Sequence, residues 1–73
     1  MSDARQAIAA AREAGADTYA PQIFSRSLRL LALAESTLAR RRYKLAADQA
    51  TLARQLAIES MEEAATESKR RPR

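Results

Sequence analysis

The sequence lacks both cysteine and histidine, and this absence removes most of the chemistry that small proteins use. Without cysteine the chain has no disulfide, no thiolate zinc site and no thiol nucleophile. Without histidine it lacks the usual general base and the commonest metal ligand. We therefore predict a protein that is not an enzyme, with no catalytic residues, no cofactor and no metal.

Residues that favour strands and turns are also scarce. The 73 residues include three aromatic side chains, one glycine, two prolines and no valine, whereas 18 are alanine and eight are leucine. Alanine, leucine and the long unbranched polar residues lose the least free energy on entering a helix. No apolar run approaches the about 20 residues of a membrane span. The composition predicts a small all-α domain without a transmembrane segment.

The first interruption of the helical pattern lies between residues 15 and 20. Gly15 suits the left-handed conformation that follows many helices, and Pro21 suits the first turn of the next helix. Tyr19 lies between them as an apolar anchor. We predict a turn here.

The second interruption is less marked, because no glycine or proline separates the two flanking helical segments. The apolar phase is lost between Arg40 and Tyr43, and adjacent like charges disfavour a continuing helix. We place the break near Arg41 and Arg42, and the alternative is one helix of almost fifty residues.

These two breaks predict a three-helix antiparallel up-down-up bundle with tetratricopeptide-like helix packing. The second helix would be the middle one, and the third would extend well beyond the first. The predicted helices span residues 3–14, 21–41 and 43–68. They form a single domain over residues 1–68, followed by a basic disordered tail over residues 69–73. The residues predicted to define the two turns are Gly15, Tyr19, Pro21 and Tyr43.

The stretch Ala-Gly-Ala-x-x-Tyr-Ala-Pro at residues 14–21 resembles the signature of a family of alanine-rich helical domains of unknown function. These domains occur in bacterial envelope proteins and lipoproteins. The resemblance continues through Phe24, Leu31 and Leu38 into an alanine-rich helix that begins at Tyr43. It implies a periplasmic or outer-membrane-associated protein whose signal segment is not in this sequence, and another envelope protein as a partner. A chain that is native from Met1 would instead be cytoplasmic. The family lends no catalytic residues, and it usually has glycine in the second turn, where this chain has Arg41 and Arg42.

Eight leucines are more than a thin three-helix core requires. The third helix carries alanines on one side and leucines on another, rotated by roughly 120–140°. The leucines widen the apolar face of the bundle, contact another chain or contact lipid; in a further alternative, the first helix covers them and leaves the alanine side free. We predict a homodimer or other homo-oligomer. The predicted partner-interface residues are Leu30, Leu33, Leu45, Leu52 and Leu56.

The positive charge is concentrated in two short segments. Residues 1–39 balance at four basic and four acidic groups, and residues 45–68 carry one basic and five acidic groups. The remaining basic groups lie in residues 40–44 and 69–73. Clustered arginines are typical of anion binding, but no recognition helix or interleaved aromatic residues indicate nucleic acid, which we do not expect as a partner. The candidate anion-binding residues are Arg40, Arg41, Arg42 and Lys44.

The sequence therefore predicts a non-catalytic interaction or scaffold domain that self-associates or binds a partner protein through leucine-rich faces. The alternative is a small anion-binding module that contacts nucleic acid or a membrane surface through residues 40–44 and the basic tail.

Overall fold

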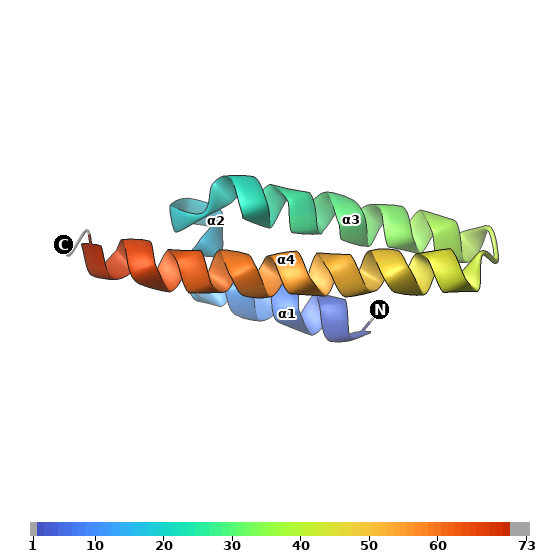
Figure 1. Ribbon diagram of the computed structural model, residues 1–73, viewed down its shortest axis with the longest axis horizontal. Coiled ribbons are helices and arrows are strands. Elements are labelled where there is room, and N and C mark those ends of the chain that lie inside the picture. The colour runs from blue at the N-terminus through green and yellow to red at the C-terminus, as the bar shows by residue number, and fades with distance from the viewer. Residues whose placement is uncertain (1, 71–73) are drawn as a thin grey trace.

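The computed structural model describes residues 2–70, and over these residues the chain forms four helices. Three are long and one is a single turn. The helices are α1 (Ser2–Glu13), α2 (Ala16–Tyr19), α3 (Pro21–Ala39) and α4 (Tyr43–Arg70). The predicted all-α fold is confirmed, and α2 is the element that the three predicted helices did not include. The long helices follow one another in alternating directions along an elongated body that measures 46 × 17 × 13 Å (Figure 1).

The first turn is built around Gly15, which has a φ of 87°. The Gly15 N–H donates to the Arg12 carbonyl at 3.0 Å, and the Gly15 carbonyl accepts from the Tyr19 N–H at 2.8 Å. Gly15 thus closes the end of α1 and caps the start of α2. Pro21 then occupies the first turn of α3, where a missing N–H costs nothing.

The second turn interrupts the chain between α3 and α4, as the loss of apolar phase predicted. Arg41 has a φ of 65°, although it is not glycine. Its N–H donates to the Leu38 carbonyl at 2.9 Å, and the Arg42 N–H donates to the Thr37 carbonyl at 3.2 Å. These two bonds form the Schellman arrangement that closes a helix end, with arginine in the left-handed position that usually holds glycine.

The central helix of the bundle is α4. Figure 1 shows α4 between α1 and α3, and α4 contacts both of them far more extensively than α1 and α3 contact each other. The prediction that the segment 21–41 is the middle helix is therefore wrong. The cause is the small-residue side of α4, because alanines allow a neighbouring helix to approach closely.

The core is small and lies where all four helices meet. Its side chains are mostly alanine, with two larger residues, Ile8 and Phe24, and four partly buried ones packed around them: Tyr19, Leu28, Leu31 and Met61. Arg12 covers the Phe24 ring, with its guanidinium carbon 5.5 Å from the ring centroid. None of the five predicted interface leucines belongs to this core.

The last turns of α4 project beyond the other helices (Figure 1). The helix includes residues 69 and 70, so it extends into the segment that the sequence predicted as a disordered tail. Cationic side chains such as Lys69 suit the negative end of a helix dipole. Residues 71–73 of that predicted tail lie outside the described residues.

Candidate interaction surfaces

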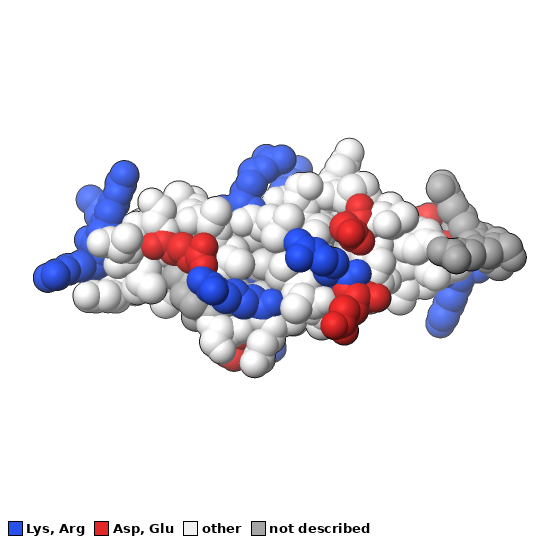
Figure 2. Space-filling model, turned by 180° about the vertical axis from the view of Figure 1, so that it is seen from behind, with Lys and Arg blue, Asp and Glu red and all other residues white. Residues whose placement is uncertain are grey.

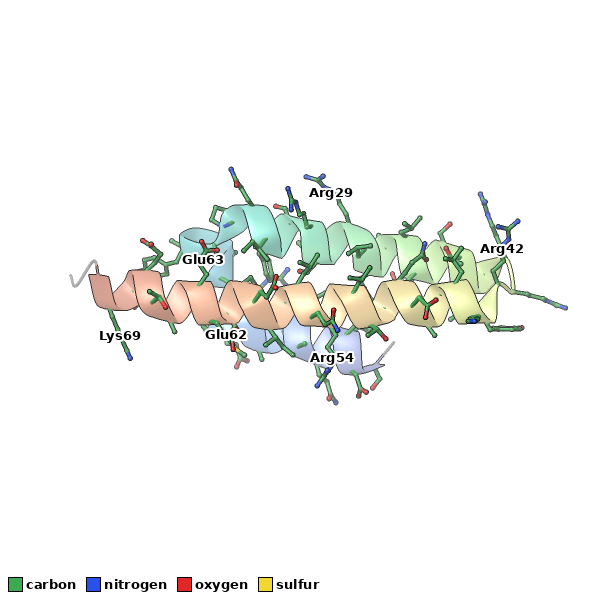
Figure 3. The ribbon with its side chains drawn as sticks, in the orientation of Figure 1. Arg29, Arg42, Arg54, Glu62, Glu63 and Lys69 are labelled. Carbon is green, nitrogen blue, oxygen red and sulfur yellow. The ribbon has the colours of Figure 1, made fainter. Side chains whose placement is uncertain are left out.

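One side of α4 is occupied by α1. Two shallow grooves mark the contact: Asp3 and Ala4 lie against Ala47 and Ala50, and Ala7 lies near Ile58. Figure 3 shows Arg54 and Glu62 on this same side of α4. The alternative in which the first helix covers the leucines is therefore wrong, because α1 packs against the alanine side.

A groove between α1 and α3 shows which side of α3 faces α1. Ile8 and Arg12 of α1 line this groove together with Leu28, Leu31 and Glu35 of α3. Arg5 also forms an exposed ion pair with Glu35. α3 also contacts α4 directly, and near the start of α3 Ile23 lines a groove with Glu63 of α4.

The five predicted interface leucines lie on the other face of the α3–α4 layer, away from α1. At about 100° per residue, the leucines of each helix point roughly 160° away from the residues that contact α1. We call this surface the leucine face; in Figure 1, α1 lies behind and below α4, on the other side of the α3–α4 layer. Its members are Leu30 and Leu33 on α3 and Leu45, Leu52 and Leu56 on α4.

The leucine face is partly open to solvent. Leu33 and Leu52 are each 49% exposed and Leu45 is 44% exposed. Leu30 and Leu56 are half-buried. Side chains of both charge signs are exposed on the same face: Arg26 on α3, and Glu59 and Glu63 on α4. The face therefore combines an apolar centre with charges of opposite sign on its two helices.

The four candidate anion-binding residues lie together at the end of the molecule where α3 turns into α4. We call Arg40, Arg41, Arg42 and Lys44 the cationic tip. All four are exposed, and within the described part of the chain no ion pair or side-chain hydrogen bond to them is formed. Figure 2 shows Lys and Arg side chains gathered at this end, and Figure 3 shows Arg42 extending away from the helices.

The structure distributes the predicted turn residues between buried and exposed positions. Gly15 and Pro21 lie at helix boundaries, and the Tyr19 ring packs partly against the core. Tyr43 begins α4, but its side chain is 62% exposed, so it packs little against the second turn.

Leu38, in the last turn of α3, lies outside the core. The side chain points in the same direction as those of Phe24 and Leu31, but it is 40% exposed. The reason is that α1 is short: its first turn lies beside Ala47 of α4, and among residues 2–70 no third helix covers the last turn of α3. Periodicity gives the direction of a side chain but not the length of the helix that has to cover it.

Two buried serine hydroxyls donate to backbone carbonyls of their own helices. The Ser27 hydroxyl donates to the Phe24 carbonyl at 2.6 Å, and the Ser60 hydroxyl donates to the Ala57 carbonyl at 2.7 Å. Sequence reasoning did not single out Gln49, yet within residues 2–70 its Oε1 atom is buried without a hydrogen-bond partner.

No three carboxylates of the described residues gather as a metal-ligand group, the Glu59–Glu63 segment included. None of the helices described here is long and apolar enough to cross a bilayer.

Comparison with known proteins finds no family model, no characterised protein and no solved structure that matches this chain. The resemblance to envelope-protein domains therefore remains a prediction from residues 14–21.

Proposed function

We propose that this chain is a non-catalytic helical interaction domain that self-associates through the leucine face. The observation that carries the proposal is the exposure of Leu33, Leu45 and Leu52 on one two-helix surface, outside the core. Exposed leucines are ordinary when they are scattered, whereas a contiguous group bordered by charges is typical of an interface.

A second copy of the chain is the occupant that best suits this surface. The leucine face carries a cation on α3 and acids on α4, so it is complementary in charge to itself. Two copies related by a twofold axis would pack two helical hairpins face to face as a four-helix bundle, and twofold dimers are the commonest homo-oligomers.

The expected affinity is modest. Covering the exposed half of a leucine contributes roughly 1 kcal/mol, so three leucines on each copy contribute about 6 kcal/mol. A dissociation constant of about 100 μM requires about 5.5 kcal/mol. We take Leu30, Leu56 and the flanking charges to offset the entropy lost on association. We therefore expect a dissociation constant near 100 μM.

The envelope location and the tetratricopeptide-like packing belong to the same proposal. The location is supported by the Ala-Gly-Ala-x-x-Tyr-Ala-Pro stretch alone. The packing is supported by the fully buried alanines of α3 and α4, such as Ala34 and Ala53, which allow two helices to approach closely.

Sedimentation equilibrium tests self-association directly. The wild-type chain should pass from monomer to dimer over a concentration range centred near 100 μM. The double variant Leu33→Glu/Leu52→Glu should stay monomeric, because two carboxylates would be buried on each copy. Both positions are half-exposed, so the variant should retain its helical circular dichroism.

The matched control is Thr51→Glu/Ala65→Glu, which adds the same charge at exposed positions of α4 away from the leucine face. This control should dimerise like the wild type. A wild-type chain that remains monomeric at millimolar concentration contradicts the proposal. Loss of helicity in the Leu33→Glu/Leu52→Glu variant would mean that these leucines stabilise the fold. The milder Leu52→Gln variant then decides the question, because the proposal requires that it dissociates the dimer and keeps its helicity.

A further inference from the structure

The end of the α3–α4 hairpin exposes apolar and cationic side chains together. Leu38 and Tyr43 flank the turn and are among the exposed large apolar residues of the chain. They are uncovered because the first turn of α1 reaches only Ala47 on α4. The tip of the hairpin is thus a two-helix structure without the third helix that shields the core.

The charge at this end is of one sign only. The cationic tip contributes four positive charges, and no acidic residue occurs between Glu35 and Asp48. The four side chains are exposed, and among the described residues they form no ion pair. An uncompensated cluster of this kind attracts a surface with dense negative charge.

We propose that the cationic tip docks on an anionic lipid bilayer, with Tyr43 and Leu38 at the level of the headgroups. The arginines and Lys44 contact lipid phosphates, while the Tyr43 ring occupies the interface, where amphipathic aromatic side chains are favoured. The domain lies on the membrane and does not cross it, in keeping with the absence of a spanning helix among residues 2–70.

A lipid surface suits this end better than nucleic acid does. Phosphate contacts along a duplex need cations spread over a face or a groove-entering helix, whereas these cations occupy a single turn. A phosphate backbone would not bury the exposed side chains of Leu38 and Tyr43. At a bilayer their removal from water is favourable through the hydrophobic effect. The combination of the two residue types at one turn therefore favours the bilayer.

Co-sedimentation with vesicles measures the charge contribution. The probes are vesicles of phosphatidylcholine with about one-third phosphatidylglycerol, compared with phosphatidylcholine alone. The chain should bind only the anionic vesicles, and less at high salt. Each Lys or Arg near an anionic surface raises the partition coefficient about fivefold, so Arg40→Ser/Arg42→Ser should lower it about 25-fold.

The matched control is Arg29→Ser/Arg54→Ser, which removes the same charge from exposed positions of α3 and α4 that lie far from the tip and outside the leucine face. It should lower the partition coefficient less than about fivefold, because a screened charge acts only within about 10 Å. Arg41→Gly provides a second charge-removing variant at a position where glycine suits the backbone, so its binding loss cannot come from unfolding. Equal losses in the tip and control pairs would overturn the proposal.

A fluorescent reporter tests contact with the bilayer itself. The chain has no tryptophan, so Tyr43→Trp introduces a single reporter. Its emission should shift to shorter wavelength when anionic vesicles are added, whereas Tyr19→Trp, in α2 near the opposite end of the molecule, should show no shift. An unshifted emission from the Tyr43→Trp variant with vesicles bound overturns the proposal. A second outcome also overturns the proposal: the chain does not bind vesicles but binds duplex DNA, and the Arg40→Ser/Arg42→Ser variant loses the DNA binding. That result would favour nucleic acid instead.

Discussion

The ring of Tyr19 lies against Gly15 so closely that a Cβ atom on residue 15 would be 3.1 Å from Cδ2 and 3.3 Å from Cε2 of the ring. The same glycine has a φ of 87°, a conformation that residues with a Cβ atom seldom adopt. The turn between α1 and α3 therefore depends on glycine for two reasons, its backbone conformation and the space that Tyr19 fills.

Gly15→Ala should lower the free energy of unfolding by about 1–2 kcal/mol, the cost of a left-handed residue, plus a contribution from the Tyr19 ring. Urea denaturation followed by circular dichroism measures the change. In a Tyr19→Ala background the substitution should cost less, because only the backbone term remains. An equal cost in both backgrounds would mean that the ring contact contributes nothing.

Arg41→Gly should have the opposite effect. Arg41 already holds the left-handed position of the second turn, with a φ of 65°. Glycine adopts this conformation without steric strain, so the free energy of unfolding should rise by roughly 1 kcal/mol. Thermal and urea denaturation both report the gain.

The control for this prediction is the neighbouring residue. Arg42 does not have a positive φ, and Arg42→Gly removes the same charge. It should lower the free energy of unfolding by about 0.5–1 kcal/mol, because glycine increases the conformational entropy of the unfolded chain and relieves no strain in the folded one. If both substitutions changed stability equally, relief of charge repulsion rather than backbone strain would be the cause.

Gln49→Leu should raise the free energy of unfolding by about 1 kcal/mol. The buried Oε1 atom of Gln49 has no hydrogen-bond partner among residues 2–70, and a buried polar atom without a partner costs about 1–3 kcal/mol. Leucine has a similar size and carries no polar atom. Gln55→Leu, at an exposed position of the same helix, should change stability by less than about 0.5 kcal/mol. A destabilising Gln49→Leu would show that the amide is satisfied by solvent.

Much of the secondary structure followed from local signals. Gly15 and Pro21 bounded the first turn correctly, because each has a backbone preference that holds in any context. The break near Arg41 was predicted from the loss of apolar phase, but the left-handed arginine was not, since no local preference favours arginine there. The one-turn helix α2 was also missed, because four residues are too few for a periodic pattern.

The leucine face illustrates what can be predicted about a surface. The spacing of Leu45, Leu52 and Leu56 placed them on a different side from the alanines, and rotation by 100° per residue is enough to establish that. Spacing could not tell whether α1 would cover the leucines or the alanines. That choice depended on Ala4, Ile8 and Ala11 of α1, which fit against the small-residue side of α4.

The sequence by itself determined that this chain is helical, where its first turn lies, which leucines share a side of a helix, and that four cations cluster at the second turn. These properties depend on composition, on glycine and proline, and on a fixed rotation per residue, all of which act within a few neighbouring residues. Only the tertiary structure decided that α4 is the central helix, that Leu38 and Tyr43 are exposed, and that the Oε1 atom of Gln49 is buried without a hydrogen-bond partner among residues 2–70. Those properties depend on how long α1 is and where it packs, and close packing between distant segments is not encoded in any single stretch of the chain.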